Sequence, residues 1–454
     1  MKRAWLTRPL AFFLTLALGA WLIPPSAPAQ PRPAPAQGPL PAVAGRALTL
    51  EEAISIALVT EPNIRARLQD YEAARFRVNQ ALSAVLPQLA GSWVANRQQS
   101  QFFAGSVGGG TPKPTPLWST NSTAQVTLSQ ILFDFGKTFA ATDAARAQAE
   151  VSRLDAEVQK DQVILAVKEA YFNLLFGKRL ITVNQEAVAR AELNLRSAKG
   201  FYEVGTRPKF DVTRAEVDLA NAHVTLIQAK NAERLARVAL NTAMGIDVNT
   251  ATEVKDILSF EPYRMVEERL IPEALRQRPE YQRINALVTA ADASVRQAFR
   301  NFFPDISGVG SYGGTFRNPK SPDDLAETWQ LGLQLSWSIF DGGNKIARYQ
   351  EAHKNVEAAQ SRVQAIELSI SQEVVQADLS LRETQERTQA AKKAVESAQE
   401  NFRLAQGRFD AGVGTIIELT DAQLALTQAQ STEAQALTDY RIAIARLERA
   451  LGRR

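Results

Sequence analysis

One strand-to-helix junction occurs twice in this chain of 454 residues. Leu128–Lys137 reads LSQILFDFGK and Leu335–Asn344 reads LSWSIFDGGN, so that Asp134 and Asp341 stand 207 positions apart. In both copies an apolar, strand-like run ends in Phe-Asp and a glycine, and a long run of helix-forming residues follows. Copies of one segment in tandem indicate copies of one structural unit, so the chain is interpreted as two halves.

The likeness extends through both halves, residues 48–260 and 261–454. Two proline pairs recur 217 positions apart and later landmarks recur 207 positions apart, so about ten residues are extra in the first half. Near the middle of each half we align Gly205 with Gly414, 209 positions apart. The landmarks are Glu61–Pro62 and Arg278–Pro279, Leu86–Pro87 and Phe303–Pro304, and Met244–Gly245 and Leu451–Gly452.

Each half begins with a predicted helix. Thr49 followed by Glu52 is a capping-box pattern, and apolar residues follow at helical spacing. We expect this helix to end near Leu86–Pro87, because proline cannot continue a helix.

A strand, a loop and a second strand are expected next. From Trp329 to Phe340 apolar residues alternate with Gln, Gly and Ser, which predicts a strand with one apolar and one small polar face. Residues 98–121 and 318–327 are rich in Gly, Pro and Ser and are expected to be the loops. The longer first loop would account for the extra residues.

A very long helical hairpin closes each half. Lys137 to Tyr202 and Asn344 to Arg408 contain no proline, and a helix of about 65 residues would be on the order of 100 Å long. Glycine-containing turns at 204–208 and 412–415 end these helices, and return helices run to Met244–Gly245 and Leu451–Gly452. Asp134 and Asp341, each followed by glycine, are interpreted as helix caps at a tight corner.

The N-terminus has the features of an export signal. Residues 1–29 combine a basic start, an apolar stretch and an Ala-Pro-Ala cleavage site, and residues 30–47 are predicted to be a Pro/Ala-rich linker. Cleavage lowers the formal charge from +4 to +1, so the basic composition is not a sign of nucleic-acid binding. Apolar runs are shorter than the about 20 residues of a membrane-spanning helix, so membrane insertion is expected through strands.

The predicted strands fit an outer-membrane barrel. Their polar faces carry Gln, Ser, Gly and Thr, which suit a barrel lumen, and aromatic residues lie near the strand ends or on the apolar faces, namely Trp93, Tyr312, Trp329 and Trp337. Two hairpins supply too few strands to close a barrel, whose smallest examples have about eight strands. We therefore expect the chain to oligomerise.

The order of these elements resembles the TolC family of outer-membrane efflux proteins over nearly the whole mature chain. The resembling motifs are Leu86–Pro87 and Phe303–Pro304, the two Phe-Asp-x-Gly junctions and the two turns. The resemblance implies an α+β membrane protein with two efflux repeats, whose homotrimer forms a twelve-stranded β-barrel continued by an α-helical coiled-coil tunnel. It implies an exit duct for efflux or type I secretion in the cell outer membrane, with the helices in the periplasm and with a periplasmic adaptor and an inner-membrane pump as partners.

The resemblance assigns roles to the two turns. The segment from Gly414 to Ala422 resembles the family's periplasmic entrance, where a trimer would turn Glu418 or Asp421 into a ring of carboxylates. The alternative is that these acids only complement a helix dipole. Ile416 and Ile417 beside them predict an apolar constriction. Adaptor contacts are expected at Gly205, Thr206, Arg207, Lys209, Asp211, Gly414 and Thr415, with Thr206, Arg207 and Lys209 exposed.

Enzyme chemistry has few candidates. The sequence has no Cys, and its two histidines, His223 and His353, lie on predicted long helices without a ligand pattern around them. We expect no catalytic residue, cofactor or metal. The alternative function is a trimeric structural or adhesive coiled-coil protein anchored by a barrel.

Overall fold

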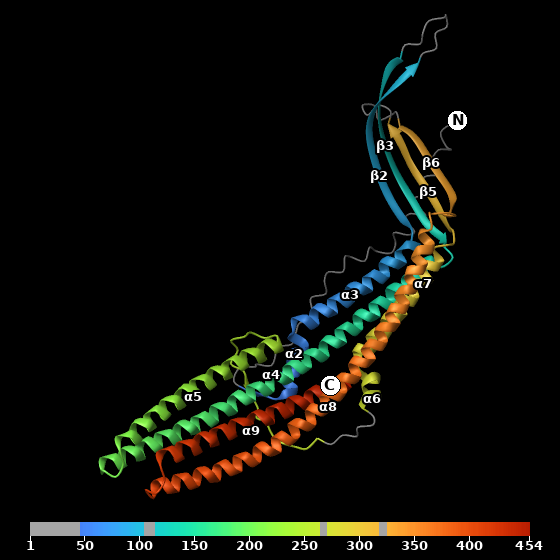
Figure 1. Cartoon of the computed structure of the whole chain (residues 1–454). Helices are drawn as coiled ribbons and strands as arrows, with labels where there is room; N and C mark the ends of the chain where they lie inside the picture. Colours follow the sequence, from blue (N-terminus) through green and yellow to red (C-terminus); the bar gives the residue numbers. More distant parts are fainter. Residues whose placement is uncertain (1–45, 104–113, 264–269, 317–324) are drawn as a thin grey trace, which may run out of the picture.

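A computed structural model describes residues 46–103, 114–263, 270–316 and 325–454. A sheet of long strands occupies one end of the molecule, and helices run from it to two tips at the opposite end (Figure 1). The predicted signal and all but the last two residues of the predicted linker lie outside the described residues.

The elements follow the predicted order in both halves. The helices are α2 (Leu50–Thr60), α3 (Pro62–Leu82), α4 (Lys137–Glu203), α5 (Lys209–Met244), α6 (Leu270–Gln277), α7 (Pro279–Arg300), α8 (Asn344–Asp410) and α9 (Ile416–Leu451), with a short 3₁₀ turn at Ser83–Val85. The strands are β1 (Ala47–Leu48), β2 (Gln88–Phe103), β3 (Pro114–Phe133), β4 (Glu253–Val254), β5 (Asp305–Phe316) and β6 (Leu325–Ser336).

The first predicted helix is divided into two. The Thr49 capping box is confirmed, but α2 ends at Thr60 and α3 starts at Pro62. The residue before a proline is driven out of the helical region, and Glu61 accordingly has an extended ψ of 122°. α6 and α7 are separated in the same way before Pro279, where Arg278 has a ψ of 124°.

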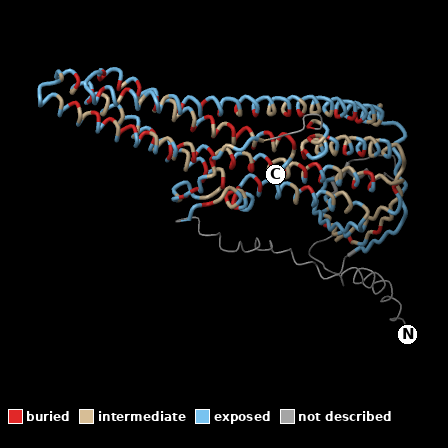
Figure 2. Tube along the Cα trace, turned by 90° about the horizontal axis from the view of Figure 1, so that it is seen from below, coloured by how far each residue is buried: buried red, intermediate tan, exposed pale blue. Residues whose placement is uncertain are grey.

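The long helical hairpins are confirmed. α4 and α8 each have 67 residues, and the return helices α5 and α9 each have 36. Gly245 and Gly452 end the return helices in the left-handed conformation, as predicted. Buried positions follow the helix sides that face one another, and the outer sides are exposed over long stretches (Figure 2).

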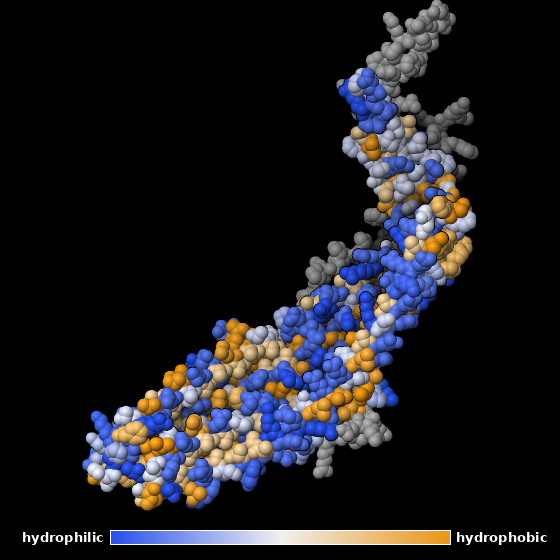
Figure 3. All heavy atoms as spheres, in the orientation of Figure 1, coloured by the Kyte–Doolittle hydropathy of each residue, from blue (hydrophilic) through white to orange (hydrophobic). Residues whose placement is uncertain are grey.

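Both hairpins of strands join one sheet in the described part of the chain, in the order β2-β3-β5-β6. The predicted alternation is confirmed, because Trp329, Tyr312 and Val126 are neighbours on one face. The other face brings Gln330, Ser311 and Thr127 together. Apolar side chains gather over β5 and β6 near the helices (Figure 3), and Leu331 and Leu333 are 69% and 76% exposed.

The strand ends differ from the prediction. β2 and β3 extend through Gln98–Phe103 and Pro114–Asn121, which the sequence pattern assigned to a loop, so the extra residues of the first half lengthen its strands. Their sequences, QQSQFF and PTPLWSTN, show no regular alternation of apolar and polar residues. β6 ends at Ser336, opposite Asp305, because the proline pair at Phe303–Pro304 leaves Trp337–Phe340 without a partner strand.

The two junctions use a capping carboxylate and two consecutive left-handed residues. Asp134 accepts the amide hydrogens of Gly136 at 2.9 Å and of Thr138 at 2.8 Å, and Asp341 accepts that of Lys345 at 3.1 Å. The acids thus bond to amides at the start of α4 and α8, but the N-cap residues are Gly136 and Gly343, two positions after the acids. The prediction that the acids are themselves the helix caps is therefore wrong by position. Phe135 of the first junction is equivalent to Gly342 of the second, and both have a positive φ. The ring of Phe135 stacks on Phe303.

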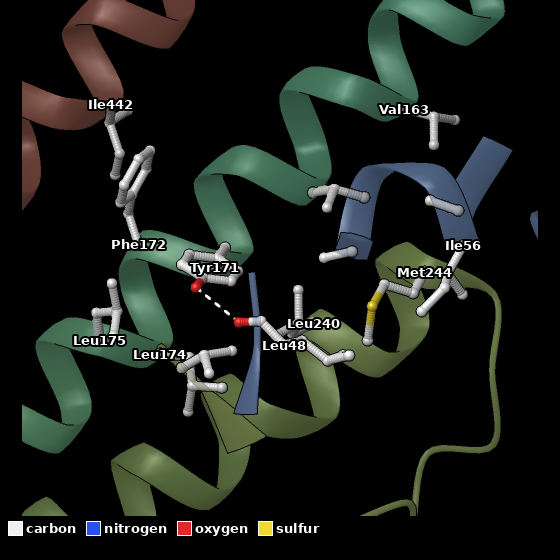
Figure 4. Close-up of a cluster of buried hydrophobic side chains, with 14 of the residues drawn as sticks. Leu48, Ile56, Val163, Tyr171, Phe172, Leu174, Leu175, Leu240, Met244 and Ile442 are labelled. Carbon is white, nitrogen blue, oxygen red and sulfur yellow. Dashed lines mark hydrogen bonds between the residues drawn. The ribbon is translucent and has the colours of Figure 1, made fainter. Parts of the chain in front are cut away.

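A hydrophobic core lies halfway along the molecule (Figure 4). The Tyr171 hydroxyl lies 2.9 Å from the Leu48 carbonyl oxygen and 2.9 Å from that of Lys255, which ties β1 and the β4 segment to α4. Burial raises the pKa of Tyr171 to about 12. Tyr440 of α9 binds the chain between β4 and α6. Its hydroxyl donates to the Glu261 carbonyl at 2.6 Å and accepts the Tyr263 amide hydrogen at 2.9 Å.

Among the residues that the structure describes, no helix combines the length and the apolar character needed to cross a membrane.

The C-terminal glycine of each return helix packs against the proline break of its own half. A Cβ atom at Gly245 would lie 2.8 Å from the Cα atom of Glu61, and one at Gly452 would lie 2.9 Å from the amide nitrogen of Arg278. The same close approach therefore fixes both return helices.

Gly245→Ala is expected to lower the free energy of unfolding by about 1–3 kcal/mol more than Gly342→Ala, because only the first adds an overpacked contact. Gly245 and Gly342 have φ values of +68° and +70°, but no atom lies within 4 Å of a Cβ at Gly342. Urea unfolding of the purified protein measures the difference. Equal losses in the two variants would contradict the packing role.

Candidate functional site

The two helical tips are built on the same turn. The Gly205 amide donates to the Tyr202 carbonyl at 2.9 Å, and the Gly412 amide donates to the Phe409 carbonyl at 3.0 Å. Both glycines are left-handed, with φ of +77° and +78°. Gly205 therefore corresponds to Gly412 at the usual spacing of 207, and its alignment with Gly414 was wrong.

A small apolar core joins the tips. Phe409, Ile416 and Leu419 of the second hairpin are 1 to 3% exposed, with Phe201 of α4 and Phe402 packed against them. The rings of Phe201 and Phe409 meet edge to face at 5.8 Å. Ile416, a predicted constriction residue, thus faces this core and not solvent, because it stands on the side of α9 that packs on α8.

Arg207 is covered, contrary to the prediction that it is exposed. Its side chain is 15% exposed, and its guanidinium carbon lies 4.7 Å from the centroid of the Phe409 ring. Nη2 donates to the Gly414 carbonyl at 2.7 Å, and Nη1 lies 3.7 Å from Asp211 Oδ2. Asp211 is also buried, so both residues act within the tip of this chain.

Gly414 and Thr415 shape the second turn. Gly414 is buried, and a Cβ atom there would lie 3.0 Å from the backbone of Arg408 and Phe409. Thr415 is exposed and caps α9, with its hydroxyl accepting the Glu418 amide at 3.2 Å. Glu418 therefore does not serve as the cap itself.

The tips expose large apolar side chains beside polar ones. Thr206 and Lys209 are exposed as predicted. The prediction missed Val204, Phe210 and Val413, which are 71%, 60% and 70% exposed. Large apolar residues at a turn that no core requires were the signal in the sequence.

One exposed face of α9 carries the remaining candidates. Ile417, Asp421 and Leu424 are exposed at a spacing of four and three residues, which places them on one side of the helix. Leu424 was not predicted, although its spacing could have indicated it. The side chain of Asp421 has no hydrogen-bond or ion-pair partner among the described residues, whereas Glu418 lies 3.5 Å from Arg408.

Polar side chains line the contact between the two hairpins. Asn194 of α4 donates to Gln423 of α9 at 2.6 Å, and Thr420 donates to Asp218 of α5 at 3.0 Å. Arg190 donates to the Gln430 side-chain oxygen at 3.3 Å, and burial lowers the pKa of Arg190. The contact between hairpins is thus hydrogen bonded.

Within the described ranges no group of three or more His, Asp or Glu side chains is arranged to hold a metal ion. His353 is exposed and packs edge to face on Tyr349 at 4.6 Å. His223 lies on α5, away from both tips.

Comparison with known proteins gives one consistent result. A family model described as outer membrane efflux protein matches residues 53–246 and 270–453. The chain is 25% identical to the alkaline protease secretion protein AprF of Pseudomonas aeruginosa over 88% of this chain and 84% of AprF. It is 23% identical to the outer membrane protein TolC of Vibrio cholerae over 89% and 90% of the two chains. The open-state outer membrane channel MtrE of Neisseria gonorrhoeae superposes with a TM-score of 0.74 at 22% identity, with 89% of each chain covered.

Phe409→Ala is expected to loosen the tips selectively, because truncation of a buried phenylalanine costs about 3–5 kcal/mol where the site cannot collapse. Amide hydrogen exchange in the last turn of α8 and the first turn of α9 should accelerate, while exchange around the core at Tyr171 stays unchanged. Val413→Ala, at a side chain 70% exposed, is the matched control. Slow exchange at the tips of the Phe409 variant would contradict the apolar core.

Proposed function

This chain belongs to the outer membrane efflux protein family and is an outer-membrane exit duct of an efflux or type I secretion system. We propose that its hairpin tips form the entrance of the duct and dock a periplasmic adaptor. The strands lie in the outer membrane, and the helices extend into the periplasm. The observation that carries the proposal is the separation of the two ends, with an apolar-faced sheet at one and exposed tips at the other.

The edges of the sheet support a homotrimer. β2 and β6 each have an unpaired side within the described residues, and backbone groups in the hydrocarbon of a membrane have to be paired. Three copies of this four-stranded sheet would supply twelve strands, above the minimum of about eight for a closed barrel.

The outer faces of the helices support the same assembly. α5 and α8 are the outer helices of the wall and carry exposed apolar side chains, including Ile227 at 67% and Leu368 at 73%. A neighbouring copy that placed its α8 against α5 would bury both faces. The two hairpins of strands interrupt both halves yet meet in one sheet, which favours a duct over a structural or adhesive stalk.

The tips support docking of an adaptor coupled to an inner-membrane pump. Val204, Phe210 and Val413 form an exposed apolar surface beside Thr206 and Lys209. Exposed apolar patches of this kind mark protein–protein contacts. The sources of cargo and energy would then lie with the partners, and the chain would supply the passive conduit.

The exposed face of α9 supports an entrance lined by Ile417 and Asp421. Three-fold symmetry would place three Asp421 carboxylates around the axis, and such a ring favours cations. The charge of Glu418 is offset by Arg408 at 3.5 Å, so Asp421 would contribute more to selectivity.

Adaptor docking can be tested by photo-crosslinking in cells. Benzoylphenylalanine at Thr206 or at Val413 should give an adduct with a periplasmic adaptor, identified by mass spectrometry, because both positions are exposed at the tips. Lys393, whose side chain is 77% exposed, is the control, about 25 Å along α8 from the tip. Adducts at Lys393 as strong as those at the tips would contradict docking there.

The acidic entrance predicts an effect on ion selectivity. Asp421→Asn should lower the cation preference of the purified duct in planar bilayers, because it removes three charges from one ring. Glu418→Gln should change selectivity less, because Arg408 already offsets that charge. A cation preference that survives Asp421→Asn unchanged would exclude Asp421 from the entrance.

A further inference from the structure

Arg207 and Gly414 occupy equivalent positions of the two repeats, and they contact each other. Gly205 and Gly412 define the spacing of 207 in the turns, which pairs residue 207 with residue 414. Arg207 Nη2 donates to the Gly414 carbonyl at 2.7 Å and lies 3.4 Å from the Phe409 carbonyl oxygen. One repeat thus provides the cation, and the other provides a carbonyl that a glycine leaves accessible.

The contact adds to the C-terminal end of a long helix. Phe409 is the penultimate residue of α8, where carbonyl groups carry partial negative charge. Its carbonyl already accepts the Gly412 amide at 3.0 Å within the turn, and a further cation at such an end is favourable. Here the cation comes from the other hairpin, so this added contact forms only when the two tips are together.

Two further contacts hold the guanidinium in one place. Its carbon lies 4.7 Å from the centroid of the Phe409 ring, and the ring itself packs on Phe201 of the first hairpin. Asp211, 5% exposed, lies 3.7 Å away on the first hairpin. A planar guanidinium that stacks, pairs and donates at once cannot be replaced in full by an ammonium group.

We propose that Arg207 is a positioning residue that clamps the two tips of one chain into a single docking surface with fixed spacing between Val204 and Val413. This inference rests on the proposed docking at the tips. The hairpins also meet farther from the tips, at Asn194 and Gln423, and Arg207 joins them at their ends. The partner would therefore recognise both turns together.

The sequence provides a clean background for the test, because it contains no native cysteine. Spin labels are attached to Val204→Cys and Val413→Cys, both on exposed side chains. Labelled chains are assembled with an excess of unlabelled chain, so that most trimers carry one labelled copy. Pulsed electron paramagnetic resonance then measures the distance between the two turns of one chain.

With Arg207 present, we expect one narrow distance distribution. Arg207→Ala should lower the ratio of clamped to separated tips about tenfold, the size expected for loss of a charge-assisted hydrogen bond. In Arg207→Lys the ratio should lie between those of the parent and of Arg207→Ala. Lys393→Ala, which removes an exposed cation of α8 far from the tips, should match the parent. The heat stability of the trimer should be the same in all variants.

An unchanged distribution in Arg207→Ala, or an equal change in Lys393→Ala, would overturn the clamp. A second arm measures the adaptor adduct from benzoylphenylalanine at Val413, which should fall with Arg207→Ala and not with Lys393→Ala. An adduct that persists while the tips separate would overturn the requirement for joined tips. If no adduct forms in the parent protein, docking at the tips is contradicted. The distance measurement would still show whether Arg207 holds the two tips together.

Discussion

The unpaired edges of the sheet set the main constraint on this molecule. In the outer membrane the amide and carbonyl groups along β2 and β6 have no water to bind, so they have to pair with strands of other copies. The need for closure determines where each copy stands and therefore where its helices begin. The capped junctions at Asp134 and Asp341 then convert the path of a strand into the path of a helix.

Duplication explains which features occur twice, and divergence explains which occur once. The glycine of each return helix packs on the proline break of its half, so Gly245 and Gly452 have matching environments. At the tips the repeats have diverged, because Arg207 and Gly414 have different side chains at equivalent positions. A tandem repeat can thus build a contact between its own copies that neither copy would have alone.

The sequence predicted those features that depend on local chemistry. Proline pairs, left-handed glycines and long proline-free runs define α4, α5, α8 and α9 nearly to the residue. The ends of β2 and β3 were missed because their residues show no regular alternation of apolar and polar side chains and include prolines. The burial of Arg207 was missed because it depends on the neighbouring hairpin. The burial of Ile416 was missed because the local pattern does not show which side of α9 packs on α8.

The two junctions differ in stiffness. Asp134 is 6% exposed and accepts bonds from three groups, and Phe135 stacks on Phe303 of the other repeat. Asp341 is exposed, and Gly342 has no ring to stack. α4 also packs on α3, α5, α7 and α9, whereas α8 packs on α6, α7 and α9. α4 is therefore supported by more neighbouring helices than α8. A force applied to the tips would accordingly be transmitted to the membrane mainly through the first repeat.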